Sequence, residues 1–284
     1  MILITGATGN VGNFLTRLLH ERGCELRILV RDPARSTDLP DSIERAVGNL
    51  DNADDVAKAV EGVDAIFLMH HGAGTQQTQN VINAARKAAK PPHIVLLSSA
   101  GARLMPLSDN PLIGQALADR EELLNESGLP VTFLRPNAFA SNVLPWVEDI
   151  RTGKVVNPTG DGRMVFITPE DIARCAAVCL TEEGHAGKGY DITGPEALTT
   201  AEAAAVISEI TGQAIEVENI SPAEYARRQI AEGVPEAMAD GLASLNRVFE
   251  LGRSAYVTDG VKNLTGRAPE TFRHWCEVHA DSLR

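Results

Sequence analysis

Residues 5–12 read Thr-Gly-Ala-Thr-Gly-Asn-Val-Gly and follow directly on the apolar run Ile-Leu-Ile at residues 2–4. The run predicts a short first strand, and the residues after the glycines predict an amphipathic helix. In that setting Gly6 permits a tight turn, Gly9 lets backbone amides approach a pyrophosphate, and Gly12 lets the helix pack closely on the strand. The stretch therefore predicts a dinucleotide-binding loop, and the alternative is a turn without a ligand.

Outward from this loop, apolar runs and helical patterns alternate as far as Arg135. Further strands are expected at residues 26–30, 65–69, 94–97 and 131–134, and helices at residues 11–22, 56–60, 75–89 and 112–127. Strands that alternate with helices predict a parallel sheet covered on both faces. We therefore expect an α/β fold with a doubly wound parallel sheet of the Rossmann type.

Beyond about residue 140 helical patterns predominate, interrupted by short extended pieces at residues 155–156, 165–166, 190–192 and 215–217. Thr168 and Ser221 are each followed by a proline at the first helical position and by an acid at the third, which predicts a helix N-cap at both positions. We expect residues 1–140 to form the dinucleotide-binding domain and residues 141–284 a smaller, mostly helical substrate lobe packed against it. The ligand site is expected in the cleft between them.

The composition argues against several function classes. The 284 residues are 44% hydrophobic and 23% charged, and 26 Lys and Arg against 38 Asp and Glu give a net charge of −12. An acidic chain with 4% aromatic residues lacks the basic, stacking surface that nucleic acids require. No apolar run approaches the ~18 residues of a membrane helix. We expect a cytoplasmic protein with a small-molecule substrate, and a homodimer stays open.

Cys175 and Cys179 are four residues apart, which places them on one face of a helix. A metal site would need a third and a fourth ligand at suitable spacing. We interpret the two cysteines as small apolar residues packed on the inner side of that helix, and we predict no metal.

The second expected strand ends in Val-Arg-Asp-Pro at residues 30–33, about twenty residues after the glycine loop. At this place an acid holds the ribose diol of NAD, whereas an arginine pairs with the 2′-phosphate of NADP. Arg31 comes first after the apolar run, Arg35 adds charge, and Asp32 can serve to cap the turn at Pro33. The pattern favours NADP(H), with NAD as the alternative cofactor and an exposed loop charge as the alternative role of Arg31.

Several motifs together resemble the atypical short-chain dehydrogenase/reductases, and within them the NmrA-like family. They lie at residues 5–12, 30–33, 62–67, 98–101, 127–129 and 134–139, the last reading Leu-Arg-Pro-Asn-Ala-Phe. Residues 190–195 and 266–269 add to the likeness, which covers nearly the whole chain. The family includes NADPH-dependent quinone reductases, dye reductases and non-catalytic redox sensors.

The resemblance implies a nicotinamide dinucleotide and a set of residues around it. It implies that the cofactor is held by Gly6, Thr8, Gly9, Asn10, Val11 and Arg31. It further implies contacts with the adenosine side from Leu68, Met69 and His70, with adenine from Asn49, where many relatives have an acid, and with the nicotinamide side from Ser98, Pro136, Asn137 and Phe139. Asn137 would orient the carboxamide or a substrate oxygen and Phe139 would shield the ring; a simple turn with a core phenylalanine is the alternative.

The resemblance fails at the proton donor. Classical members use a Tyr-x-x-x-Lys pair, in which the lysine lowers the pKa of the tyrosine. In this chain the residues four positions after the three tyrosines are Gly194, Gln229 and Gly260. His70 and His71 are candidates for proton transfer, and packing against the cofactor or exposure to solvent are the alternatives. The catalytic residues stay unassigned.

These observations predict an NADP(H)-dependent oxidoreductase that passes hydride to a quinone, a conjugated carbonyl or a similar small acceptor without the tyrosine–lysine pair. Such acceptors delocalise the developing anion, so that water can protonate it and orientation supplies most of the rate. The alternative is a non-catalytic NADP(H)-binding redox sensor. A third interpretation is an isomerase or a biosynthetic enzyme with bound cofactor. The sequence does not name the substrate.

Overall fold

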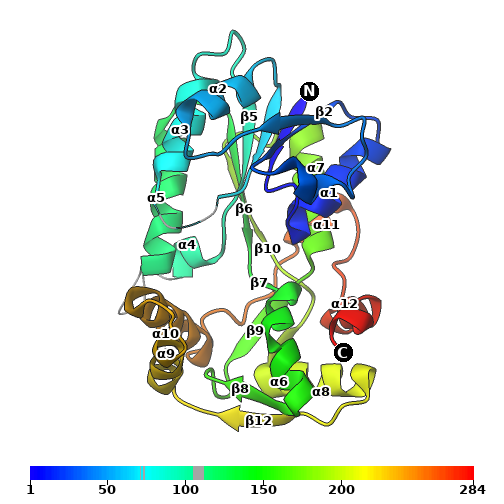
Figure 1. Cartoon of the computed structure of the whole chain (residues 1–284), viewed down its shortest axis with the longest axis vertical. Coiled ribbons are helices and arrows are strands. Elements are labelled where there is room, and N and C mark those ends of the chain that lie inside the picture. The colour runs from blue at the N-terminus through cyan, green and yellow to red at the C-terminus, as the bar shows by residue number, and fades with distance from the viewer. Residues whose placement is uncertain (71, 73, 105–111) are drawn as a thin grey trace.

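A seven-stranded parallel sheet forms the centre of the computed structural model, which describes residues 1–70, 72, 74–104 and 112–284 (Figure 1). The strand order is β10-β6-β5-β4-β1-β2-β3, and every neighbouring pair is parallel. The strands are β1 (Ile2–Thr5), β2 (Leu26–Val30), β3 (Glu44–Val47), β4 (Ala65–Leu68), β5 (His93–Leu97), β6 (Val131–Pro136) and β10 (Lys188–Ile192).

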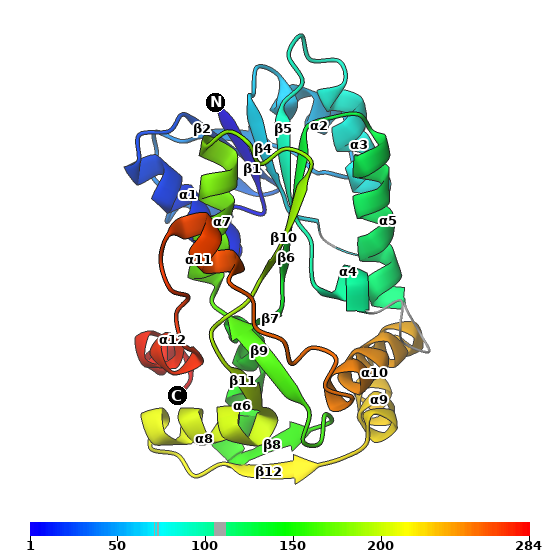
Figure 2. The ribbon, with the colours of Figure 1, turned by 180° about the vertical axis from the view of Figure 1, so that it is seen from behind.

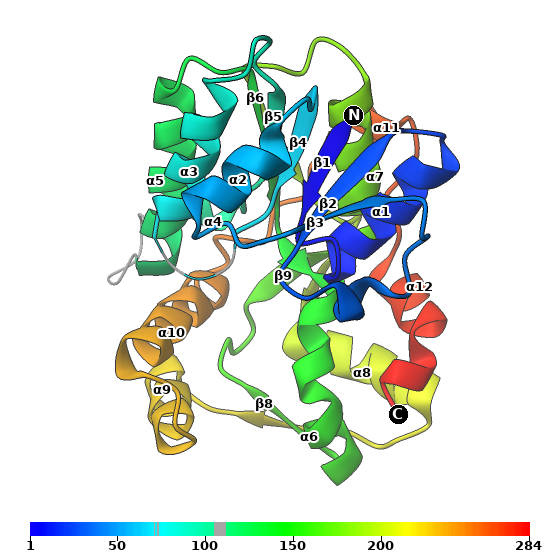
Figure 3. The same ribbon diagram turned by 45° about the horizontal axis from the view of Figure 1, so that its top comes forward.

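Helices cover both faces of this sheet, as the tilted view in Figure 3 shows. On one face lie α1 (Asn10–Glu21), α7 (Pro169–Thr181) and α11 (Gly260–Thr265), with Leu15, Cys175 and Val261 in one apolar core. The other face carries α2 (Ala53–Val60), α3 (Gln76–Ala85) and α5 (Leu112–Glu126), whose apolar sides form a second core. The predicted doubly wound Rossmann-type sheet is confirmed.

The glycine loop lies between β1 and α1, as the sequence predicts. Gly6 has a φ of +67°, a left-handed conformation that L side chains rarely adopt. A Cβ on Gly12 would come within 2.1 Å of the Gly6 carbonyl oxygen, so only glycine allows this close approach of helix and loop. Gly9 is the N-cap of α1, and its backbone leads directly into the helix.

Strand β10 shows how closely the two halves of the chain are interwoven. Residues 190–192 were expected in the second lobe, but β10 pairs with β6 at the edge of the main sheet, where Tyr190 lies opposite Leu134. Helices α7 and α11 likewise come from beyond residue 140 and pack on the main sheet.

The polar edge strand β3 was not predicted. A division into domains at residue 140 stays a prediction.

The rest of the chain builds a second layer of structure at one end of the main sheet (Figure 2). It has a three-stranded sheet of β7 (Ala138–Phe139), β9 (Arg163–Ile167) and β11 (Ala197–Thr199), and a parallel pair of β8 (Lys154–Asn157) and β12 (Glu216–Asn219). Its helices are α6 (Val147–Thr152), α8 (Thr200–Thr211), α9 (Pro222–Ala231), α10 (Glu236–Glu250) and α12 (Phe272–Val278). The remaining short helices are α4 (Gly101–Leu104), η1 (Pro33–Ser36), η3 (Ala140–Trp146) and η4 (Ala280–Ser282).

Two of the predicted helix starts in this part are confirmed. The Thr168 hydroxyl accepts a hydrogen bond from the Asp171 amide at the start of α7, and the Ser221 hydroxyl accepts one from the Glu224 amide at the start of α9. Both helices have proline in their first turn. Sequence signals of this kind are local, which is why they predict element boundaries well.

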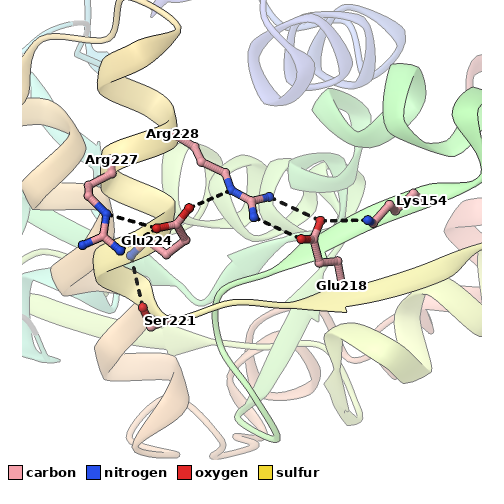
Figure 4. Close-up of polar contacts among 6 residues, drawn as sticks. All are labelled: Lys154, Glu218, Ser221, Glu224, Arg227 and Arg228. Atoms are coloured by element: carbon pink, nitrogen blue, oxygen red, sulfur yellow. Dashed lines mark hydrogen bonds and ion pairs between the residues drawn. The ribbon is translucent and has the colours of Figure 1, made fainter.

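A surface network of ion pairs connects β8, β12 and α9 (Figure 4). Glu218 on β12 binds Lys154 of β8 at 3.1 Å and Arg228 of α9 at 3.0 Å. Arg228 also binds Glu224 one turn earlier on α9. The network fixes the approach of α9 to the two-stranded sheet.

The cysteines of α7 pack as predicted. Cys175 and Cys179 are fully buried, and burial raises the pKa of the Cys179 thiol to about 12 and that of Cys175 as well. They fill the core between α7 and the main sheet. None of the helices in the described part of the chain combines the length and the apolar character that a membrane-spanning helix requires.

Candidate active site

A pocket of about 220 Å³ opens at the carboxyl ends of β1, β2 and β4. Its walls are the glycine loop, the end of β2, the turn after β3 and the end of β4. The predicted site residues that line it are Gly6, Thr8, Gly9, Arg31, Asn49, Met69 and His70. Ligands bind at this edge of a parallel α/β sheet, next to the helix N-terminus that favours a phosphate.

The floor of the pocket joins β1 to β4. The Thr5 hydroxyl accepts a hydrogen bond from the Met69 amide at 2.7 Å. A Cβ on Gly6 would lie 2.9 Å from the Met69 Cε atom, so Met69 packs against the glycine loop itself. The glycines thus leave a cradle that side chains would fill, and this cradle fits a dinucleotide pyrophosphate.

The end of β2 presents two cations to the pocket. Arg31 and Arg35 both line it and are exposed, whereas the Asp32 carboxylate accepts a hydrogen bond from the Ala34 amide at 3.0 Å as the N-cap of η1. Asp32 therefore has a structural role in the turn, as the sequence analysis allows. Two guanidinium groups at this edge suit a 2′-phosphate.

Asn49 and His70 border the same pocket from opposite sides. The Asn49 side-chain oxygen accepts a hydrogen bond from the Asp51 amide at 3.2 Å, so its amide hydrogens face away from that turn. The His70 Nε2 atom is 2.7 Å from the Thr78 hydroxyl of α3. His71, the second candidate for proton transfer, lies outside the described residues.

A second pocket of about 250 Å³ lies at the same edge of the sheet, beyond β5 and β6. Its polar side chains are those of Ser98, Ser99, Asn137, Asn142 and Ser254, and its apolar ones include Leu104, Phe139, Leu245, Val248 and Phe249. The three predicted residues Ser98, Asn137 and Phe139 meet here. Because β4 and β5 are adjacent strands, the two pockets lie side by side along this edge of the sheet.

Helix α10 forms the far wall of the second pocket and is held there by tight backbone packing. The turn between β8 and β9 touches the end of α10, where a Cβ on Gly162 would come within 2.2 Å of the Phe249 carbonyl oxygen. Asn137 donates a hydrogen bond to the Ser254 carbonyl oxygen at 2.9 Å and accepts one from the Ser254 hydroxyl at 2.6 Å. Asn137 therefore joins the sheet edge to the segment that follows α10.

A buried ion pair lies behind the second pocket. Arg135 of β6 binds both carboxylate oxygens of Glu121 of α5, at distances from 2.5 to 3.1 Å, and these hydrogen bonds raise the pKa of Arg135. The Ser98 hydroxyl donates to Glu121 at 2.5 Å. Ser98 therefore turns its proton toward Glu121 and its lone pairs toward the pocket.

Four predicted cofactor residues line neither pocket: Asn10, Val11, Leu68 and Pro136. Val11, Leu68 and Pro136 are buried in the scaffold, whereas the Asn10 side chain is exposed at the start of α1. Val11, Leu68 and Pro136 therefore pack beneath the glycine loop and the strand ends. A contact of any of the four residues with the cofactor stays a prediction.

Several residues in or near the two pockets were not predicted from the sequence. Arg120 of α5 lines neither pocket, but it is buried and donates to the carbonyl oxygens of Gly72 and Gly74, at 2.6 and 2.8 Å, in the segment after β4. Burial lowers its pKa. Asn142, Ser254 and the α10 wall were missed as well, because their place at the pocket depends on long-range packing. For Arg120, the one available sequence signal was an arginine on the inner side of an expected helix.

Comparison with known proteins agrees with this geometry. A family model described as NAD(P)H-binding matches residues 6–183. The NAD(P)H azoreductase of Xenophilus azovorans is 33% identical over 284 residues, which is 99% of this chain and 98% of that protein.

Two solved structures share nearly the whole fold. The NADPH-dependent quinone oxidoreductase of Escherichia coli in complex with NADPH has a TM-score of 0.86 at 27% identity and covers 99% of this chain and 100% of that one. The triphenylmethane reductase of a Citrobacter species in complex with NADP(H) has a TM-score of 0.83 at 25% identity, again covering 99% of this chain and 100% of the other.

Proposed function

The chain belongs to the NAD(P)H-binding family and is an NAD(P)H-dependent oxidoreductase, and we propose that it transfers hydride from NADPH to a quinone, a conjugated carbonyl or a similar small, electron-poor acceptor. One observation carries the proposal: a nucleotide pocket on the glycine loop and a second, largely apolar pocket lie at the same edge of the sheet. The cofactor supplies the hydride when it is bound. The chain's own residues orient the two partners.

The first pocket supports a preference for NADPH over NADH. Arg31 and Arg35 provide two cations at the end of β2, and the Asp32 carboxylate that would suit a ribose diol is engaged in capping η1. Gly6, Thr8 and Gly9 would hold the pyrophosphate, and Met69 supports the loop from below.

The second pocket supports an acceptor that needs no strong acid. Among its described lining residues none is charged, and its apolar part comes from α4, β7 and α10. Such walls exclude water around a planar molecule and hold it against the nicotinamide ring. A quinone or enone delocalises the charge that hydride transfer creates, and solvent at the open side of the pocket can deliver the proton.

The test is anaerobic oxidation of NADPH by the purified protein with a panel of quinones, enones and dyes. We expect turnover with at least one acceptor and faster turnover with NADPH than with NADH. Tight NADPH binding without oxidation across the panel, together with a partner protein recovered in only one redox state of the cofactor, would contradict the proposal and identify a redox sensor.

A further inference from the structure

Two walls of the first pocket are formed by segments that lie beyond the ends of strands. One is the turn after β3, from which Asn49 and Leu50 line the pocket, and the other is the end of β4, where His70 lines it. The strand pairing of the main sheet ends before them, at Val47 of β3 and Leu68 of β4. Other contacts must therefore fix the positions of these two walls.

Helix α3 directs two buried amide side chains at the turn after β3. Gln77 and Asn80 are only 7% and 5% exposed. The Asn80 Nδ2 atom donates a hydrogen bond to the Leu50 carbonyl oxygen at 2.8 Å, and the Gln77 Nε2 atom donates one to the Asp51 carboxylate at 2.8 Å. The Asn80 side-chain oxygen accepts a hydrogen bond from Gln76 at 2.9 Å, which fixes the orientation of this amide. Because a buried amide without partners is costly, these bonds hold the turn in one position against α3.

The same turn of α3 contacts the opposite wall. Thr78 is fully buried, and its hydroxyl oxygen is 2.7 Å from the His70 Nε2 atom. Thr78 follows Gln77 directly, and successive residues of a helix point about 100° apart. One turn of helix thus connects the turn after β3 with the imidazole at the end of β4.

We propose that Gln77, Thr78 and Asn80 are positioning residues for the adenosine half of the cofactor. None of the three lines the first pocket, so each acts through the turn after β3 or through His70. The inference rests on the proposed function, in which Asn49 and His70 border the adenosine. Walls that are held in place before the nucleotide arrives need no ordering when it binds, and this strengthens binding.

The proposal predicts an effect confined to one half of the cofactor. The pyrophosphate is expected on the glycine loop, and the nicotinamide is expected at the second pocket, which α3 does not line. Loss of a positioning contact should therefore weaken adenosine 2′,5′-bisphosphate, which is the adenosine half of NADPH, by the same factor as NADPH itself. The rate of hydride transfer from bound NADPH should stay unchanged.

The test uses substitutions that keep the shape of the side chain and remove its hydrogen bond. These are Gln77→Met and Thr78→Val, and Gln79→Met is the matched control. The Gln79 amide donates to Asn83 on the same helix, and Gln79 lines neither pocket. We expect titration calorimetry to show dissociation constants about three- to tenfold higher for both NADPH and adenosine 2′,5′-bisphosphate in the first two variants. The control should bind both ligands as the wild type does.

Steady-state kinetics provide the readout that a purely structural role would not give. In Gln77→Met and Thr78→Val the KM for NADPH should rise while kcat at saturating NADPH stays within about twofold of the wild type. Asn80→Leu should act in the same direction and should also lower the thermal midpoint, because it leaves the buried Leu50 carbonyl without its donor.

Three outcomes would overturn the inference. The first is unchanged dissociation constants in Gln77→Met and Thr78→Val, even with lower thermal midpoints, because α3 would then only stabilise the fold. The second is an equal loss of affinity in Gln79→Met. The third is weaker NADPH with unchanged adenosine 2′,5′-bisphosphate, which would place the effect outside the adenosine half. A wild-type protein that binds both ligands but oxidises no NADPH with any acceptor would instead contradict the proposed function.

Discussion

At the scale of a single residue, we propose that Arg31 sets the preference for NADPH over NADH. Removal of its guanidinium should weaken the binding of NADPH by about 1.5 to 3 kcal/mol and leave the binding of NADH nearly unchanged, since only NADPH has the 2′-phosphate. Titration calorimetry of both cofactors with Arg31→Ala tests this. Arg22→Ala is the matched control, because Arg22 is an exposed arginine at the end of α1, outside the pocket. Equal losses for NADPH and NADH would mean that Arg31 merely supports the loop.

Asn137 was expected to contact the nicotinamide or the substrate, and the structure indicates a second, structural role for its side chain. Its hydrogen bonds to Ser254 hold the segment after α10, so we expect Asn137→Ala to reduce kcat more than it weakens NADPH binding. Steady-state kinetics with a separate NADPH titration measure both effects. Ser254→Ala should cause a similar loss of kcat, and the double variant should lose little more than either single one. Additive losses would separate the two residues and contradict the account.

At the scale of elements, the network around Glu218 should make stability depend on pH. Arg228 and Lys154 lower the pKa of Glu218 from 4.5 to about 2. A lowered folded-state pKa means that the stabilisation is complete above pH 4.5 and is lost as the pH falls toward 2.

The thermal midpoint of Glu218→Gln should therefore lie slightly below that of the wild type near neutral pH, and the difference should shrink through this acidic range and in high salt. Glu216→Gln is the control, because Glu216 lies on the same strand and forms no ion pair with a described residue. A difference that stays constant with pH would contradict the assignment.

The elements that the sequence predicts are those whose signals are local. The glycine loop, the apolar strands β4 and β5 and the capped starts of α7 and α9 need only neighbouring residues to be recognised. Strand β3 was missed because it is a polar edge strand with no fully buried residue. The place of β10 could not be predicted from its own residues, because its partner β6 lies far away along the chain.

The same division applies to the site. Arg31 and the glycines lie where a motif predicts them, whereas Asn142 and Ser254 reach the second pocket only through the packing of η3 and of the segment after α10. Arg120 lines neither pocket, and only the packing of α5 brings it to the segment after β4. None of these residues belongs to a recognisable sequence motif. The sequence alone does not show which helix packs against which strand end.

At the scale of the whole molecule, the fold combines two structural layers into one site. The main sheet supplies the nucleotide loop and the ends of β5 and β6, and the residues beyond 140 supply both β10 and the α10 wall. The second pocket therefore exists only when α10 is docked against the sheet edge. The predicted split into a cofactor domain and a substrate lobe stays a prediction, and β10, α7 and α11, which lie beyond residue 140, belong with the main sheet.

The central claim is that one cofactor orientation delivers hydride from the first pocket to an acceptor in the second. It is tested most directly with NADPH carrying deuterium at C4 on one face or the other, oxidised by the enzyme with a quinone, and with mass spectrometry of the recovered NADP⁺. The account predicts that one deuterated form keeps its label completely and the other loses it completely. A mixture of labelled and unlabelled NADP⁺ from each form, or no oxidation of either, would contradict it.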